Sequence, residues 1–144
     1  MTDMPRDPSP RFTQRVADPK VAHDIRVVSG LIEIYCKGTH QDRSRSPLDS
    51  AASQLGVYGS HPPKMCEECA DHARYAETRR AYCPQDPKPF CAHCETHCYK
   101  PDEAEWERRV MRYAGPRSLF SRYASDAIKH MRDSRRWRKT HGKM

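Results

Sequence analysis

The segment KMCEECADHARYAETRRAYCPQDPKPFCAHCETHCYKP, residues 64–101, decides the fold of this 144-residue chain. It holds six of the seven cysteines but, of the Leu, Ile, Val and Phe residues, only Phe90. The whole chain has 17 residues of these four types, or about 12% of 144. This fraction is well below the roughly 20% at which burial can offset the entropy lost on ordering. A segment this poor in large apolar residues cannot bury a conventional core. The cysteines must therefore organise it by binding something other than apolar side chains.

The spacing of the cysteines indicates metal binding. Within the segment it reads Cys66-x2-Cys69-x13-Cys83-x7-Cys91-x2-Cys94-x3-Cys98, and Cys36-x3-His40 lies upstream. Each C-x2-C turn brings two thiolates to one ion, and four ligands complete a tetrahedral shell. Residues 1–10 contain acids and prolines and no apolar stretch typical of a secretory signal, so we expect a reducing cytoplasm. The alternative, a set of disulfides, is disfavoured by the odd number of cysteines.

Chain length divides the predicted ligands into two sets. If residues 69–83 are mostly helix, 14 steps of about 1.5 Å separate Cys69 from Cys83 by about 20 Å, too far for one small centre. The first set follows that helix and consists of Cys83, Cys91, Cys94 and Cys98. The second set joins the start of that helix to the end of an upstream one and consists of Cys36, His40, Cys66 and Cys69. A rival pairing joins Cys66 and Cys69 to Cys91 and Cys94, because residues 84–90 could just run back along the helix.

The cofactor stays open between zinc and an iron–sulfur cluster. Four thiolates suit either. Zinc on four cysteines is the commoner structural arrangement, whereas Cys83-Pro84 and the close C-x2-C-x3-C run also suit a cluster. His97, beside Cys98, is predicted to donate a hydrogen bond to a ligand sulfur.

The rest of the sequence predicts helices. Asp18-Pro19 is typical of a helix N-cap followed by proline, and an apolar stripe from Val21 ends near Cys36. A second helix is predicted over residues 68–80. A third begins at Asp102 as N-cap and ends at Gly115-Pro116. A fourth starts at Pro116, and its stripe is predicted to pack in the core: Leu119, Phe120, Tyr123, Ala124, Ala127, Ile128 and Met131. Strand signals are nearly absent, so we predict an all-α class: a small helical domain with irregular cysteine-rich metal-binding loops and a C-terminal helical hairpin.

The predicted domain spans residues 18–131. Residues 1–17 are rich in proline and charge, and we expect them to be disordered. Residues 41–63, rich in Ser, Gly and Pro, are predicted to form a long exposed loop. Residues 132–144 are predicted to form a basic tail.

Most of the net charge of +7 lies at the C-terminus. Residues 129–144 contain seven bases and one acid. Such a run could contact nucleic-acid phosphates, with Trp137 stacking on a base. The alternative is a solvated end that aids solubility. The candidate nucleic-acid residues are Arg135, Arg136, Trp137, Arg138 and Lys139.

Several classes of protein are excluded or lack support. No apolar run of 18 residues exists, so a membrane span is excluded. No Ser-His-Asp set, phosphate-binding glycine loop or organised carboxylate pair supports a hydrolase or a kinase. A thiol oxidoreductase using Cys66 and Cys69 lacks the βαβ context of such motifs. We therefore expect a protein that is not an enzyme.

Several local motifs occur together in this chain. They are Ile34-Tyr35-Cys36 with His40, the cysteine pairs with Cys83-Pro84, and most specifically VMRYAGPR at residues 110–117. In these motifs the chain resembles the nitrous oxide-stimulated promoter family over residues 20–40 and 64–131. Glu67 and Glu95 stand where prolines are expected in the cysteine turns, but the ligands are intact.

The resemblance implies a small bacterial cytosolic protein, induced by nitrogen oxides, with a role in nitrosative stress. Together with the cysteines it favours a metal-thiolate protein that senses nitric oxide or helps maintain iron–sulfur proteins. Its partners would then be iron–sulfur proteins or the cluster-assembly machinery. The alternative is a zinc-stapled nucleic-acid-binding module that uses the basic C-terminal tail.

Overall fold

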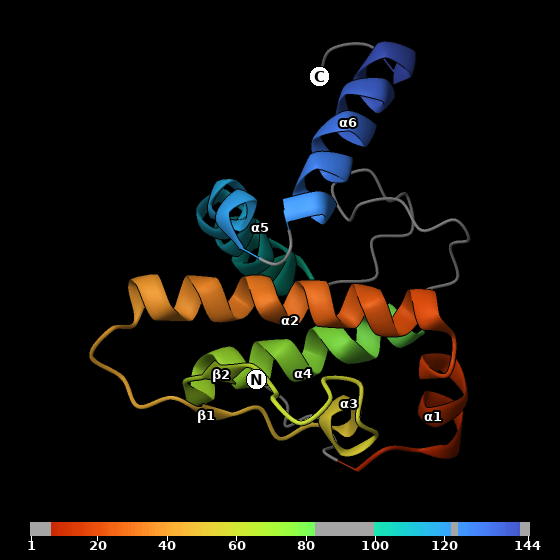
Figure 1. Cartoon of the computed structure of the whole chain (residues 1–144), viewed down its shortest axis with the longest axis vertical. Helices are drawn as coiled ribbons and strands as arrows, with labels where there is room; N and C mark the ends of the chain where they lie inside the picture. Colours follow the sequence, from red (N-terminus) through yellow and green to blue (C-terminus); the bar gives the residue numbers. More distant parts are fainter. Residues whose placement is uncertain (1–6, 83–99, 122–123, 142–144) are drawn as a thin grey trace.

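Helix α2, Pro19–Thr39, is the central element of the computed structural model, which describes residues 7–82, 100–121 and 124–141 (Figure 1). It begins as the sequence predicts, because the Asp18 carboxylate accepts a hydrogen bond from the Lys20 amide at 2.9 Å and proline occupies the first turn. Its buried residues recur at helical spacing, from Val21 and Ile25 to Ile32 and Cys36. Its most extensive contacts are with helices α4 and α5.

The other described elements are short or of moderate length. They are α1 (Pro10–Val16), β1 (Ser46–Pro47), α3 (Ala51–Gln54), β2 (Lys64–Met65), α4 (Glu67–Ala81), α5 (Pro101–Arg117), the 3-10 helix η2 (Ser118–Phe120) and α6 (Ala124–His141). The two strands form one antiparallel pair. The predicted helical class is confirmed, with this small sheet added.

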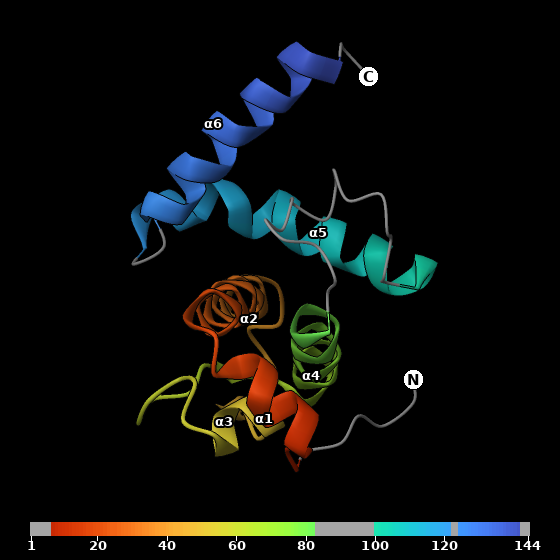
Figure 2. The same cartoon turned by 90° about the vertical axis from the view of Figure 1, so that its right-hand side faces the viewer.

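The helices form layers around the α2–α4 pair. Helix α5 crosses one side of the pair, and α1 and α3 lie on the other side (Figure 2). Alanines along α4, such as Ala70, Ala73 and Ala76, are buried and let it approach α2 closely. Acidic residues in the first turn of α4 and arginines in its last turn match the helix dipole.

The buried residues fall into two clusters. One lies where α2, α4 and α5 meet and is built around Ile32, Trp106 and Val110, together with the three cysteines Cys36, Cys66 and Cys69. The other lies at the opposite end of α2 and includes Phe12, Val16, Val21, Ile25, Ala51, Ala52 and Ala81. The first cluster positions the candidate site described below.

Parts of two segments that we predicted to lack order or burial are ordered and buried. Within residues 1–17, α1 is capped by Ser9, and its Phe12 and Val16 are buried at i, i+4 spacing. Within residues 41–63, Leu48 and Ser50 are buried, and the segment contains β1 and α3. For these buried residues the predictions were wrong, because their packing partners lie far along the sequence, on α2 and α4.

The buried carboxylate of Glu77 on α4 explains the order of residues 50–58. It accepts hydrogen bonds from the hydroxyls of Ser50, at 2.7 Å, and Tyr58 and from the backbone amide of Ala52. Tyr58 also lies 2.7 Å from the Ser29 hydroxyl of α2. Polar Ser and Tyr side chains therefore hold a segment that its composition alone marks as an exposed loop.

The C-terminal helices differ from the prediction in their ends. Helix α5 starts at Pro101, with Lys100 rather than Asp102 as N-cap, and runs through Pro116 to Arg117. The proline is tolerated in the last turn because Ser118 donates from its hydroxyl to the Gly115 carbonyl, and its backbone amide also points back into that turn.

Helix α6 begins at Ala124 rather than at Pro116, and the described large apolar side chains of the stripe that we predicted for the core are exposed. The side chains of Phe120, Tyr123 and Ala127 lie outside the described set. The helix projects away from the other helices (Figure 1), and Leu119, Ile128 and Met131 are 37%, 54% and 51% exposed. Its helical structure continues to His141, through most of the predicted basic tail. Among the described residues, no helix combines the length and the apolar character needed to cross a bilayer.

Candidate metal centre

Four predicted ligands meet where α2 ends and α4 begins. Cys36 lies in the last turn of α2, and His40 follows four residues later, so both side chains emerge on the same side of the helix end. Cys66 is the N-cap of α4 and Cys69 lies in its first turn. The pairing of β2 with β1 precedes Cys66 directly and fixes where α4 starts. We call these four residues the Cys3His centre.

The distances within the Cys3His centre suit one small ion. One ligand atom from each residue lies within 4.8 Å of all the others. The His40 Nδ1 atom is 3.6 Å from the Cys66 sulfur and 3.4 Å from the Cys69 sulfur. In a tetrahedral zinc site with Zn–S near 2.3 Å and Zn–N near 2.0 Å, neighbouring donor atoms are about 3.5–3.8 Å apart. The donor set and its spacing therefore fit a tetrahedral ion.

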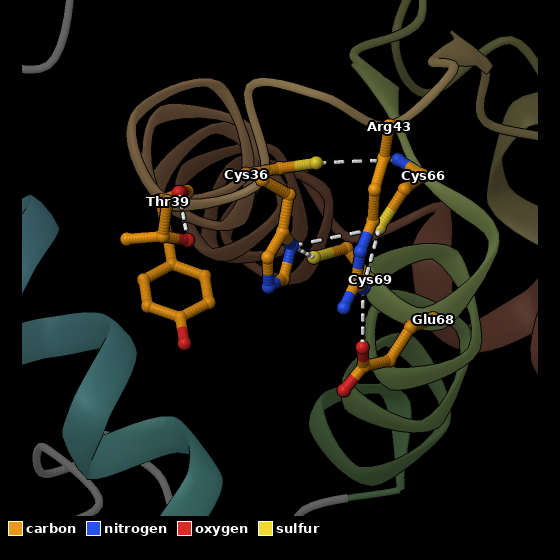
Figure 3. A network of polar contacts seen from close by, with 8 residues as sticks. Cys36, Thr39, Arg43, Cys66, Glu68 and Cys69 are labelled. Carbon is orange, nitrogen blue, oxygen red and sulfur yellow. Dashed lines mark hydrogen bonds and ion pairs between the residues drawn. The ribbon is translucent and has the colours of Figure 1, made fainter.

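Hydrogen bonds orient the sulfurs (Figure 3). The Cys66 amide donates to the Cys36 sulfur at 3.2 Å. Arg43, in the segment after α2, donates to the Cys66 sulfur at 3.7 Å and also to the Glu68 carboxylate. The cysteines are at most 3% exposed, whereas Arg43 and Glu68 are about half exposed. The centre thus has an inner side in the core and an outer edge covered by this ion pair.

The protonation of the four ligands reflects this placement. Burial raises the pKa of Cys36 and of Cys69, and the neighbouring sulfurs raise that of Cys69 further. For Cys66, burial acts in the same direction, but hydrogen bonds from the Cys69 amide and from Arg43 outweigh it and lower the pKa. Burial, together with the charge of Arg43, lowers the pKa of His40, so its imidazole is neutral at pH 7. Three sulfurs this close ionise together only beside a cation.

Aromatic side chains from α2 and α5 support the histidine. The Tyr35 ring meets the His40 ring edge-on, with centroids 5.5 Å apart. The same tyrosine contacts Trp106 and Tyr113 of α5 at centroid distances of 5.6 and 6.0 Å. Helix α5 therefore forms an aromatic wall against the helix end that carries Cys36 and His40.

Gly38, between the two α2 ligands, is a supporting residue that the sequence analysis missed. A Cβ atom at this position would lie 1.7 Å from the Tyr113 hydroxyl oxygen, so only glycine lets α5 approach this closely. The available signal was the VMRYAGPR motif, in which Tyr113 is the tyrosine. Arg43 was missed as well, because nothing in residues 41–63 marks it locally.

The remaining predicted site residues divide into two groups. The first ligand set and the predicted hydrogen-bond donor lie outside the described residues: Cys83, Cys91, Cys94, Cys98 and His97. The rival pairing of Cys66 and Cys69 with Cys91 and Cys94 falls there too. Of the nucleic-acid candidates on α6, Arg135, Arg136 and Lys139 are exposed, whereas the side chains of Trp137 and Arg138 are outside the described set.

Fold and site together define a small helical protein with a cluster of three buried cysteines and one half-buried histidine. The chain belongs to the nitrous oxide-stimulated promoter family, whose family model matches residues 19–143. The family resemblance seen in the sequence is thus confirmed. It also extends further than we expected, because residues 132–143 lie inside the match.

A relative from Escherichia coli (strain K12) is the uncharacterized protein YgbA. It is 38% identical over 63 residues, which are 43% of this chain and 53% of the relative. The matched part therefore spans about half the length of that curated relative. No solved structure matches the chain.

Proposed function

We propose that the Cys3His centre holds a single zinc ion and that the protein is a cytoplasmic metal-thiolate protein of the nitrosative stress response. The observation that carries the proposal is the convergence of four donor atoms, from two helix ends, at the spacing of a tetrahedral ion. Family membership supplies the link to nitrogen oxides. The role is non-enzymatic: reaction at the sulfurs changes the state of the protein itself.

The spacing favours one ion over an iron–sulfur cluster at this centre. A cluster places its own iron and sulfide atoms between ligands bound to different irons, which holds those ligands further apart. All four donor atoms here lie within 4.8 Å of one another. Zinc prefers such a compact set of sulfur and nitrogen donors, and a closed four-ligand shell is typical of structural zinc.

The sulfurs provide the chemistry by which the centre would respond to nitrogen oxides. Bound zinc would keep the three cysteines ionised at neutral pH. The Cys66 thiolate lies next to the half-exposed pair of Arg43 and Glu68, at the outer edge of the centre. It attacks the nitrosyl nitrogen of a small S-nitrosothiol, a new S–N bond forms, and the old S–N bond breaks to release the donor's thiolate. A nitrosated sulfur carries no charge and binds metal poorly, so the ion would lose one of its two ligands from α4 and would be held less tightly.

Metal analysis of the full chain tests the centre. We expect zinc in the wild type and a loss of about one zinc per chain in His40→Ala. The matched control is His61→Ala, because His61 is an exposed histidine outside the centre. Equal zinc in the two variants would contradict the site, and loss of iron together with sulfide in His40→Ala would contradict the single zinc ion.

Zinc release tests the response. Treatment of the zinc-loaded wild type with S-nitrosoglutathione should release zinc to a chromogenic chelator and add a nitrosyl group to Cys66, detected by mass spectrometry. Reduced glutathione at the same concentration is the control reagent. Retention of zinc under both conditions would refute the sensing role while leaving the metal centre in place.

A further inference from the structure

Helix α6 concentrates positive charge on one face. Five exposed basic side chains recur along it: Lys129, Arg132, Arg135, Arg136 and Lys139. At about 100° per residue, they fall within an arc of about 120°, which we call the basic face. The ten steps between the first and the last cover about 15 Å of helix axis. Asp126 and Asp133, the two acidic residues of the helix, lie outside this arc.

Among the described residues, the contacts of α6 with the other elements are concentrated at its base. Its most extensive contacts are with η2, and Asp126 pairs with His23 of α2 at 2.7 Å. Figures 1 and 2 both show the rest of α6 extending away from the other helices. Asp126 lies about 120° around the helix from Arg132, so the basic face turns away from the attachment to α2.

We infer that α6 binds double-stranded DNA, with the basic face contacting phosphates along the major groove. A helix with its side chains is about 10–12 Å across, and the major groove of B-DNA is about 12 Å wide. A projecting helix can enter that groove without collision with the body of the protein. Ile128 and Met131, about half exposed on the same side, provide apolar contacts of the kind that thymine methyl groups accept.

The shape and charge pattern of α6 disfavour two other polyanionic surfaces. The major groove of A-form RNA is deep and narrow and does not admit a helix. A helix at a membrane surface needs an apolar face that continues along its length. On α6 the stripe of Ile128 and Met131 continues as Arg135 and Lys139 in the next two turns, so membrane insertion would bury those charges.

The expected size of the effect follows from the number of charges. Five phosphate contacts predict that log K falls against log salt with a slope of about −4.5, or an affinity loss of about 500-fold between 50 and 200 mM salt. Removal of three of the five contacts should reduce the slope to about −1.8. Fluorescence anisotropy with a short labelled DNA duplex of mixed sequence measures both quantities.

The decisive comparison uses two variants that lose the same charge. Arg132→Gln/Arg135→Gln/Lys139→Gln removes three charges from the basic face. Its control removes three exposed charges from α5, Arg108, Arg109 and Arg112. All six positions are exposed, so both variants should keep the wild-type circular dichroism spectrum.

The expected result is weaker binding and a reduced salt slope for the α6 variant only. Equal losses in both variants would overturn the inference, because net charge would then account for binding. No binding to the duplex at 50 mM salt would overturn it as well. So would tighter binding to an RNA duplex, or to phosphatidylcholine vesicles that contain phosphatidylserine.

Discussion

Replacement of Gly38 by alanine is expected to destabilise the wild-type protein but to stabilise a variant in which Tyr113 has been shortened. The new methyl group would lie 1.7 Å from the Tyr113 hydroxyl oxygen and 2.3 Å from the ring carbon that carries it. The tyrosine would therefore have to swing away. It would leave its edge-on contact with Tyr35 and the guanidinium of Arg117, which lies 3.7 Å from the ring centroid.

The magnitude is the balance of three contributions. Loss of the tyrosine pair costs about 0.5–1.5 kcal/mol and loss of the cation–π contact about 0.5–1 kcal/mol. Alanine in a helix is about 0.5–1 kcal/mol more favourable than glycine. Gly38→Ala should therefore lower the free energy of unfolding by about 0.5–1.5 kcal/mol in the wild type. In Tyr113→Ala only the helix contribution remains, so the same change should raise that free energy by up to about 1 kcal/mol.

Urea denaturation of the zinc-loaded single and double variants measures this coupling. Zinc content must be compared in parallel, because Gly38 lies between Cys36 and His40. A reversal of sign between the two backgrounds, with a coupling energy of about 1–2.5 kcal/mol, would support the close approach of α5 to α2. The same effect of Gly38→Ala in both backgrounds would refute the claim that Tyr113 excludes a side chain at position 38.

The buried acidic side chains of Glu107 and Glu77 give two further predictions. Burial, with Glu103 nearby, raises the pKa of Glu107 to about 8. The folded state therefore binds the Glu107 proton more tightly than the unfolded state does, and the free energy of unfolding falls as pH rises from about 4 towards 8. Glu107→Gln should thus stabilise the protein relative to wild type more at pH 8 than at pH 5.5, by about 1.4 kcal/mol per pH unit in urea denaturation, whereas the exposed Glu105→Gln should show no such trend. A pH-independent difference for Glu107→Gln would contradict this. Glu77→Ala leaves the Ser50, Tyr58 and Ala52 donors without their acceptor, so it should lower the free energy of unfolding by at least about 2 kcal/mol and speed proteolysis within residues 41–63. Protease resistance equal to that of the wild type would contradict this prediction.

Local rules were enough to predict α2, α4 and the two ligand pairs of the Cys3His centre, whereas the choice between this centre and the rival pairing stayed open. Capping at Asp18 depends only on adjacent residues, and Cys36 and His40 share a helix face because they are four apart. Cys66 and Cys69 lie together in a single turn. The helical rise of about 1.5 Å per residue then predicts that the next cysteine in the sequence, Cys83, is too far from Cys69 to join the same centre. The geometry within each pair therefore follows from short-range spacing, whereas the meeting of the two pairs depends on the packing of α2 against α4.

The features that sequence failed to predict depend on distant partners. The burial of Phe12 requires the far end of α2, and the order of residues 50–58 requires one carboxylate on α4. The position of Arg43 follows from the β1–β2 pairing, which has no strong signal. For α6, spacing defines an apolar stripe through Ile128 and Met131, but a stripe does not specify what covers it, and in this structure the stripe stays exposed.

The position of the Cys3His centre along the chain affects how the protein is made. Its ligands all lie between residues 36 and 69, so they are synthesised before Cys83 and the cysteines beyond it. At about 5–20 residues per second, translation of the 14 residues from Cys69 to Cys83 takes about 0.7–3 s. The ends of α2 and α4 can meet in that interval, before Cys83 and the cysteines beyond it compete for the same metal. The order of synthesis thus favours correct partition of seven similar thiols, and the late helix α5 then closes over a centre that is already assembled.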